Sequence, residues 1–170
     1  ADCREKIKYA SNTLLELVNE VLDMSKLESG EVVLEEVGFN IDQLSDGTVV
    51  ILEEVAKERN VQIIKEGRSI AHPYLIGSPT HVKRVLMNVL SNAVKYNRDN
   101  GFIYISYKEL ESNKPGYSLF EFTCRDTGIG MSKEFQERIF EPFAQEHIGS
   151  RSKYVGTGLG MPIAKSLVEK

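Results

Sequence analysis

A run of glycines beside one carboxylate is the first feature of the sequence that could do chemistry. Residues 126–131 read DTGIGM, after a strand-like run over 117–125 and before a polar run that favours a helix. Glycine tolerates positive φ and lets a ligand approach the backbone closely. The carboxylate of Asp126 can accept a hydrogen bond from an amino group such as adenine N6. The run predicts a ligand-contacting loop, with an ordinary Asp-x-Gly turn as the alternative.

A second glycine run lies further along the chain and opens onto a helix. Residues 156–161 read GTGLGM, and apolar residues follow at helical spacing, at positions 159, 163, 164, 167 and 168. The first turn of a helix has free N–H groups and a positive dipole end, so it favours an anion such as a phosphate. The alternative is a plain loop in front of a core helix.

Two asparagines supply the third candidate chemistry. Asn88 and Asn92 are four residues apart within a helix predicted from Pro79, so they share a face. Asparagine lowers helix propensity, and two on one face therefore need an explanation. Amide oxygens together with phosphates are ligands that suit Mg²⁺. Solvated or capping amides are the alternative.

The elements that must position these residues follow from the patterning. We predict a helix over 41–59, short strands over 61–64 and 74–77, and longer strands over 101–110 and 117–125. The turn sequence NKPG at 113–116 joins the last two as a hairpin that ends at Asp126. Ser132 can cap a short helix over 133–138. The fold class is therefore α+β.

The first segment, residues 4–27, predicts one long helix with a broad apolar stripe and no glycine or proline. A stripe this wide favours a bundle with a helix of another chain, and packing onto its own domain is the alternative.

Composition narrows the function classes. The chain has 170 residues, 41% of them hydrophobic, which supports a real core. A net charge of −4 argues against nucleic acid as the main partner. No apolar run is long enough to span a membrane, so we expect a cytoplasmic chain, and membrane anchoring of the whole protein is left open. Cys3 and Cys124 fit free thiols in a reducing compartment.

Four motifs in order resemble the ATP-binding domain of sensor histidine kinases, a Bergerat-fold (GHKL) ATPase related to gyrase. They are the asparagine box (Asn88–Asn97), the first glycine box (126–131), the phenylalanine box (Phe140–Phe143) and the second glycine box (156–161). The first segment is similar to the second helix of the family's dimerisation and phosphotransfer hairpin. The resemblance implies an α/β sandwich, with one mixed, mostly antiparallel sheet covered by helices on one face and preceded by a dimerisation helix.

The resemblance also implies roles for individual residues. Asn92, supported by Asn88, would hold Mg²⁺ against the phosphates of ATP, and Asp126 would recognise adenine. Lys95 would act with Asn92 in catalysis by neutralising phosphate charge, and Tyr96 would pack on the adenine or ribose. A solvated lysine and a core tyrosine remain alternatives. The family keeps a mobile ATP lid in the region of residues 144–155, where Arg151 and Lys153, and less strongly Gln145, are candidates to approach the γ-phosphate. A solvated loop side chain is the alternative for each of them. Phe140 and Phe143 would anchor a loop. The expected nucleotide contacts also include Gly128, Gly130, Gly156, Thr157, Gly158, Leu159 and Gly160.

The implied activity is that of a protein-histidine kinase: transfer of the γ-phosphoryl group of ATP to a histidine on a dimerisation hairpin, in a two-component system. We expect residues 1–30 to be part of that hairpin without the acceptor histidine, and residues 31–170 to be the ATP-binding domain without the family's last strands. A homodimer through the first helix and a downstream response regulator or receiver domain are the expected partners.

Two alternatives stay open. Ser78 stands where the family often has an aspartate, which we expect to cost a local contact; together with the expected missing strands, it leaves room for a non-catalytic nucleotide-binding or scaffold module. A hydrolytic ATPase of the same fold is the second alternative. In hydrolytic relatives a glutamate precedes the magnesium asparagine by four residues, and Asn88 cannot serve as that base.

Overall fold

The computed structural model describes residues 3–146 and 156–170. By their contacts these residues form two compact units: unit 1 comprises residues 1–33 and 133–170, and unit 2 comprises residues 34–132. The asparagine box and first glycine box therefore belong to unit 2, and the phenylalanine box and second glycine box to unit 1. The predicted domain division after residue 30 stays a prediction, since compactness does not test what each part does.

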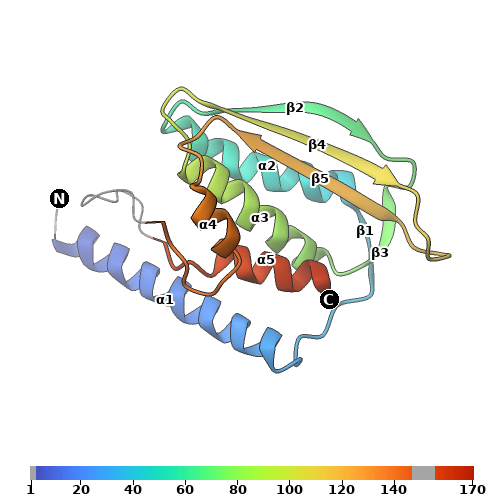
Figure 1. Ribbon diagram of the computed structural model, residues 1–170, viewed down its shortest axis with the longest axis horizontal. Helices are drawn as coiled ribbons and strands as arrows, with labels where there is room; N and C mark the ends of the chain where they lie inside the picture. The colour runs from blue at the N-terminus through green and yellow to red at the C-terminus, as the bar shows by residue number, and fades with distance from the viewer. Residues whose placement is uncertain (1–2, 147–155) are drawn as a thin grey trace. The chain divides into compact units, whose positions relative to one another are not determined.

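Unit 2 is built on a mixed three-stranded sheet (Figure 1). Strand β2 (Gln62–Ser69) pairs in parallel with β4 (Phe102–Leu110), and β4 pairs antiparallel with β5 (Leu119–Asp126). A separate antiparallel pair joins β1 (Val37–Asn40) to β3 (Tyr74–Gly77). The predicted α+β class with a mixed, mostly antiparallel arrangement is confirmed. The difference from the expectation is that the described strands form two sheets instead of one.

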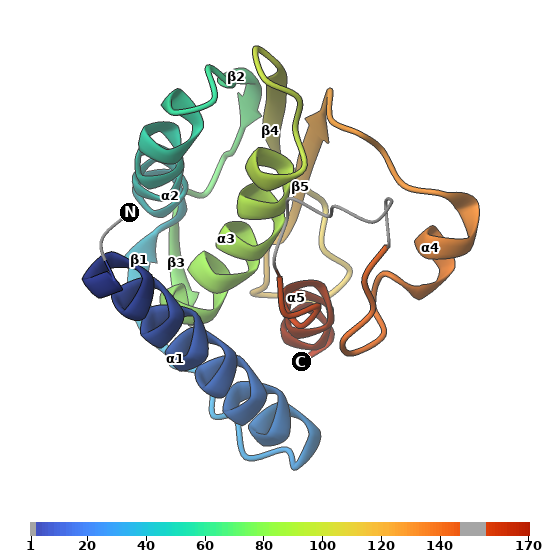
Figure 2. The same cartoon turned by 90° about the vertical axis from the view of Figure 1, so that its left-hand side faces the viewer.

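Helices α2 (Ile41–Lys57) and α3 (Pro79–Lys95) cover one face of the three-stranded sheet, as both ribbon views show (Figures 1 and 2). Alternate residues of β4 point toward the helices, because successive side chains of a strand face opposite sides. Ile103 and Ile105 are fully buried, and Leu90 of α3 is as well. The buried cluster of unit 2 comprises Val49, Leu52, Ala56, Val61, Leu86, Leu90, Ala93, Val94, Ile103, Ile105 and Tyr107.

Strand β2 is longer than the predicted strand over 61–64. Its second half is polar, so its sequence alone does not read as a strand. Lys65 and Arg68 both reach Asp46 of α2, at 2.8 and 2.7 Å, and these contacts lower the pKa of that carboxyl. Pairing with β4 and these ion pairs hold a segment whose own sequence pattern is weak.

Unit 1 contains α1 (Cys3–Glu28), α4 (Lys133–Arg138) and α5 (Gly160–Glu169). Helix α1 contacts α5, and Lys170 Nζ donates to the Gly30 carbonyl at 3.3 Å. Leu14, Leu15 and Leu22 are each more than half exposed, which suits the expectation that α1 packs in a bundle. Within the described residues, no helix combines the length and hydropathy needed to cross a bilayer.

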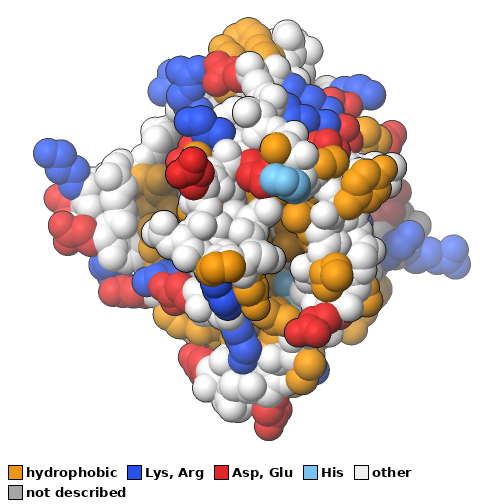
Figure 3. Space-filling view, turned by 90° about the vertical axis from the view of Figure 1, so that its right-hand side faces the viewer, with side chains coloured by type: hydrophobic (Ala, Val, Ile, Leu, Met, Phe, Trp, Pro, Cys, Tyr) orange, Lys and Arg blue, Asp and Glu red, His pale blue; other side chains and the backbone are white. Residues whose placement is uncertain are grey.

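Charged side chains of both signs are interspersed over the face of the molecule drawn in Figure 3. This mixed pattern agrees with a net charge of only −4. It gives that face no single-sign field of the kind that attracts a polyanion.

Candidate functional site

Helix α3 carries the asparagine box. Its buried stripe faces the core of unit 2, while Asn88, Asn92 and Lys95 are half-buried on the rest of its surface. Lys95 Nζ lies 4.9 Å from the centroid of the Tyr96 ring, a cation–π contact that holds the ammonium group beside the ring. The helix therefore presents two amides and a cation from successive turns. Two amide oxygens on one face are a donor set that fits Mg²⁺ when phosphates complete the coordination.

The start of α3 shows how the chain manages without an aspartate at position 78. Ser78 occupies the N-cap position but makes no side-chain cap hydrogen bond. Its hydroxyl instead lies 2.6 Å from His81 Nδ1 and donates to Glu35 Oε2 at 3.2 Å. The Glu35 carboxylate also accepts from Thr80 Oγ1 at 3.2 Å and from Thr80 N at 3.4 Å, and these bonds lower its pKa. An acid distant in sequence thus takes the place of a local cap at the positive end of the helix.

The first glycine box begins where β5 ends. Asp126 Oδ1 accepts the Gly128 N–H at 2.8 Å, which folds the carboxylate over the loop. A methyl group on Gly128 would lie 2.5 Å from the Tyr96 carbonyl oxygen and 2.6 Å from Asp126 Oδ1. Only glycine fits there, because the loop passes so close to the end of α3. The Asp126 side chain is exposed, and its adenine-recognition role stays a prediction.

Hydrogen bonds fasten the first glycine box to the end of α3. The Ile129 N–H donates to the Tyr96 carbonyl at 3.1 Å. Asn97, which is fully buried, accepts from Thr127 Oγ1 at 3.2 Å and donates to the Phe102 carbonyl at 3.0 Å. We call this set of contacts, made by Tyr96, Asn97, Phe102, Thr127 and Ile129, the box junction. It brings the predicted residues Lys95, Tyr96, Asp126 and Gly128 to one end of unit 2.

The second glycine box, in unit 1, is held mainly through its backbone. The Phe143 N–H donates to the Gly158 carbonyl at 3.1 Å, and Gln145 Nε2 donates to the Gly156 carbonyl at 2.6 Å. Gly158 has φ +75°, and a methyl group there would lie 2.7 Å from the Phe143 carbonyl carbon. Leu159 is fully buried, and the Thr157 hydroxyl accepts its N–H at 3.2 Å.

Helix α5 starts directly after this loop and its N-terminus has no side-chain cap. The N-terminus of a helix carries the positive end of its dipole, which favours an anion, so the phosphate site expected here stays a prediction. The expected phosphate contacts at Gly156, Thr157 and Gly160 are placed along this entry to the helix.

Gln145, the weaker candidate to approach the γ-phosphate, lies beside the second glycine box. Its Nε2 donates to the Gly156 carbonyl and so braces the second glycine box, and its role toward a phosphate stays a prediction. The two phenylalanines of the phenylalanine box, expected to anchor a loop, are exposed. Phe140 and Phe143 are 44% and 62% exposed, and the anchoring contact is the backbone N–H of Phe143. Lys165 Nζ lies 5.4 Å from the Phe140 ring centroid.

Arg151 and Lys153, predicted to approach the γ-phosphate, lie outside the described residues. Cys3 and Cys124 are free thiols, as expected. Burial, and then the charge of Asp126, raises the pKa of Cys124 to about 11, so this thiol stays protonated and unreactive.

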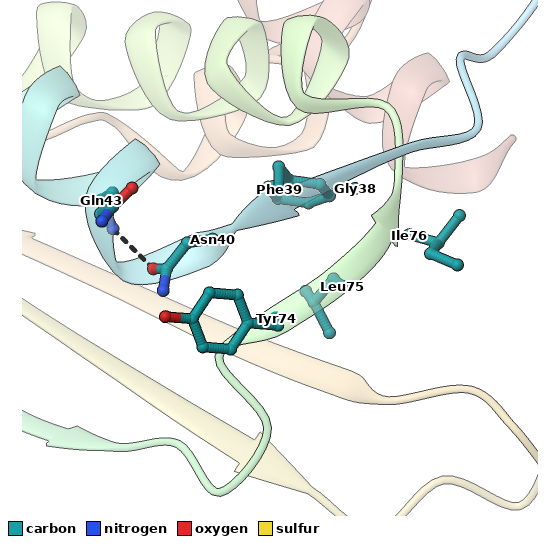
Figure 4. Close-up of a pocket in the computed structure, with 7 residues that line it drawn as sticks. All are labelled: Gly38, Phe39, Asn40, Gln43, Tyr74, Leu75 and Ile76. Carbon is teal, nitrogen blue, oxygen red and sulfur yellow. Dashed lines mark hydrogen bonds between the residues drawn. The ribbon is translucent and has the colours of Figure 1, made fainter.

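A shallow hollow of about 400 Å³ lies over the β1–β3 pair and is separate from these motifs (Figure 4). Asn40 in its wall caps α2, because its Oδ1 accepts the Gln43 N–H at 3.0 Å. The hollow is lined by Gly38, Phe39, Asn40, Gln43, Tyr74, Leu75 and Ile76. None of these residues belongs to the four boxes.

Sequence reasoning missed Glu35 and Arg59 as supports of α3, and it gave Asn97 no role. The usable signal for Asn97 was a polar residue directly after an apolar helix stripe. Glu35 and Arg59 carry no such signal, because each contacts α3 from about 35 to 45 residues away in the sequence.

Comparison with known protein families decides the assignment. Residues 77–170 match the family described as histidine kinase-, DNA gyrase B- and HSP90-like ATPases. The chain belongs to this family. The match runs from the end of β3 through α5 and so includes all four boxes.

Curated relatives narrow the family to sensor kinases. The chain is 32% identical over 168 residues, 99% of its length, to the sensory/regulatory protein RpfC of Xanthomonas campestris pv. campestris. It is 32% identical over 164 residues to the sensor histidine kinase GacS of Pseudomonas protegens, and 30% identical over 164 residues to BarA of Escherichia coli K12; both alignments cover 96% of this chain. It spans 23% of RpfC and 18% of GacS and BarA, so it corresponds to under a quarter of each relative.

Solved structures support the fold. Full-length ShkA in complex with AMPPNP superposes with a TM-score of 0.80 at 24% identity, covering 99% of this chain and 34% of that one. ThkA in complex with the response regulator TrrA superposes with a TM-score of 0.63 at 25% identity, covering 82% of this chain and 38% of that one. The chain is thus an ATP-binding domain of the histidine kinase type.

Proposed function

We propose that this chain binds ATP together with Mg²⁺ and transfers the γ-phosphoryl group to a histidine on a dimerisation hairpin. The observation that carries the proposal is the box junction. It holds the asparagine helix and the first glycine box as one piece, and the chain also has the second glycine box at the N-terminus of α5. These are the two kinds of group that a nucleoside triphosphate needs: one for the base and the cation, and one for the phosphates.

Each residue has a defined task in the proposed reaction. Asp126 accepts a hydrogen bond from the adenine amino group through Oδ2, because its Oδ1 accepts the Gly128 N–H. Lys95 supplies positive charge to the phosphates, and Tyr96 packs against the base or sugar. Bound Mg²⁺ would draw negative charge from the phosphate oxygens, and the amides of Asn88 and Asn92 would orient it. Such a site accelerates phosphoryl transfer by positioning and electrostatics.

The residue at position 88 separates transfer from hydrolysis. An asparagine amide cannot remove a proton from water at neutral pH, so the site has no base at the place where the hydrolytic relatives carry a glutamate. The base for transfer would come from the acidic neighbour of the acceptor histidine. The proposed partners are therefore a hairpin with that histidine, a second copy of the chain through α1, and a response regulator.

The test is calorimetric titration with a non-hydrolysable ATP analogue, with and without Mg²⁺, followed by ATP and a supplied acceptor hairpin. Saturable Mg²⁺-dependent binding and labelling of the acceptor histidine are expected. Binding without labelling would favour a nucleotide-binding scaffold. Steady phosphate release without an acceptor would favour an ATPase, and either result would overturn the kinase proposal.

Asp126→Asn is the matched variant for the adenine contact. It keeps an oxygen for the Gly128 N–H but removes the negative charge, so nucleotide binding should weaken by roughly 1.5–3 kcal/mol, the size of a charge-assisted hydrogen bond. Asp99→Asn, an exposed acid outside the boxes, is the control. Unchanged affinity in Asp126→Asn would remove the adenine role from this residue.

A further inference from the structure

Arg59 lies just after α2, outside all four boxes, yet its side chain ends at the C-terminus of α3. Nη1 donates to the carbonyls of Val94 and Lys95, at 3.0 and 2.8 Å, and Nη2 donates to the carbonyl of Asn97 at 2.6 Å. Nε pairs with Asp99 Oδ1 at 3.0 Å. The guanidinium group thus donates to four acceptors within residues 94–99: three carbonyls and a carboxylate.

A guanidinium group stabilises a helix most strongly at its C-terminus. The last carbonyls of a helix have no intrahelical partner, and the helix dipole places negative charge there. A planar guanidinium group has five donors in a fixed arrangement and can satisfy several of these carbonyls together. Lysine has one rotatable ammonium group and cannot reproduce that geometry. The Arg59 side chain is 28% exposed, so water competes with these contacts only in part.

Backbone contacts make Arg59 part of a paired set of turns. The Asn100 N–H donates to the Arg59 carbonyl at 3.1 Å, and the Gln62 N–H donates to the Gly101 carbonyl at 3.0 Å. Asn60, with φ 53°, donates from its side chain to Asn100 Oδ1 at 2.6 Å. The turn that follows α2 and the turn that follows α3 therefore fix each other.

The residues that Arg59 holds are the residues that form the site. Lys95 is bonded directly, and Tyr96 lies between two bonded carbonyls. Tyr96 and Asn97 in turn make the box junction to Thr127 and Ile129. A change at Arg59 therefore reaches the first glycine box through the backbone of residues 95–97.

We propose that Arg59 is a positioning residue of the nucleotide site: it sets the end of α3 against the first glycine box and so determines the affinity for ATP. This inference rests on the proposed function. Arg59 contacts neither the base nor the phosphates in this proposal and acts through Lys95, Tyr96 and the box junction.

The test compares Arg59→Lys with Asp99→Asn in the full chain. Arg59→Lys keeps the positive charge but loses the planar set of guanidinium donors. Asp99→Asn removes the carboxylate partner and leaves all three carbonyl contacts of Arg59. The dissociation constant of the ATP analogue is measured by calorimetry, folding by circular dichroism, and the amide signals of Gly128 and Ile129 by NMR without nucleotide. Arg59→Lys should fold, shift both amide signals and raise the dissociation constant about tenfold. Asp99→Asn should leave affinity and both signals close to those of the unmodified chain.

Each contrary result has a distinct meaning. A folded Arg59→Lys variant with unchanged affinity overturns the inference and leaves the proposed function standing. No binding by the folded, unmodified chain overturns the proposed function, and the positioning role falls with it. Recovery of affinity in Arg59→Ala on addition of methylguanidinium would support the inference, because a purely structural loss at another place is not repaired by that ion.

A measurement on the unmodified chain covers the case in which the variants do not fold. If Arg59 affects nucleotide affinity, then nucleotide must affect the contacts of Arg59 by the same coupling energy. The signals of the Arg59 Nη–H groups, which donate to the Val94, Lys95 and Asn97 carbonyls, should therefore shift on saturation with the analogue. A signal that stays in place at saturation would overturn the inference.

Discussion

The two glycine boxes are supported in different ways. The first is fastened by side chains: the buried amide of Asn97 and the hydroxyl of Thr127 connect it to α3 and to the start of β4. The second is held at its own backbone, by one bond from the Phe143 N–H, one from the Gln145 side chain and the close approach that Gly158 permits. Similar glycine-rich sequences therefore depend on different physical terms. The first depends on polar groups with satisfied partners, and the second on backbone shape.

The largest expected effect is the loss of Mg²⁺-dependent nucleotide binding when Asn92 of the asparagine box is changed. Asn92→Ala removes an amide oxygen from α3, so the Mg²⁺-dependent part of nucleotide binding should disappear. A weaker, Mg²⁺-independent affinity should remain through the second glycine box. Calorimetry with and without Mg²⁺ measures this, with Asn113→Ala in the β4–β5 turn as control. Full Mg²⁺ dependence in Asn92→Ala would show that Asn92 does not coordinate the metal ion.

The next effect compares the polar supports themselves. Asn97→Ala leaves the Phe102 carbonyl and the Arg98 N–H without their buried partner, and a stranded group costs about 1–3 kcal/mol. Gln145→Ala removes one exposed hydrogen bond to Gly156, worth about 1 kcal/mol or less. Urea unfolding followed by circular dichroism should rank the two variants in that order. Equal destabilisation would mean that the two boxes are supported alike.

Glycine substitutions test the dependence on backbone shape. Gly158→Ala meets both a close carbon of Phe143 and a left-handed φ, which cost about 1–3 and 1–2 kcal/mol respectively. Gly128→Ala meets the close contact without the left-handed φ, so it should cost less. Gly47→Ala, in α2 with open space around it, should raise stability by about 0.5–1 kcal/mol. Thermal unfolding measures all three, and a Gly128→Ala variant less stable than Gly158→Ala would reverse the ranking.

The smallest effect concerns pH. The carboxylates with a lowered pKa, Glu35, Asp46 and Glu109, all belong to unit 2 within the described residues. The His72 N–H and the His72 ring, and to a smaller extent the Ala71 N–H, lower the pKa of Glu109 to about 2. A lowered pKa contributes stability above the unfolded value of about 4.3, and this contribution is lost as the pH falls toward 2.

Amide hydrogen exchange should therefore be measured between pH 5 and pH 2.5 and corrected for the intrinsic pH dependence of the exchange rate. After that correction, the amides of unit 2 should lose protection as the pH falls. In Glu109→Gln the region around residues 71–72 should lose most of that pH dependence. The same pH dependence in the variant and in the unmodified chain would exclude Glu109 as its source.

The sequence predicted most elements well where the signal is local. The helix over 133–138 and the strand over 74–77 have the bounds that we predicted, and the asparagine helix begins at Pro79. Helix periodicity, strand alternation and turn residues act between near neighbours, so each is legible in a short window. The half-strand over 65–69 was missed because its partners lie on α2 and β4.

The sequence also determined the set of chemical groups: the paired amides, the exposed carboxylate of Asp126 and the two glycine runs. Their order along the chain was enough to place the family. What the tertiary structure alone decided is how these groups are held. Glu35 accepts a hydrogen bond from Thr80 at the start of α3, 45 residues away in the sequence. Arg59 donates to the Asn97 carbonyl just after the end of α3, 38 residues away. Such contacts follow from the packing of α2, α3 and the sheet, because only folding brings a helix terminus to a charged side chain so far away along the chain.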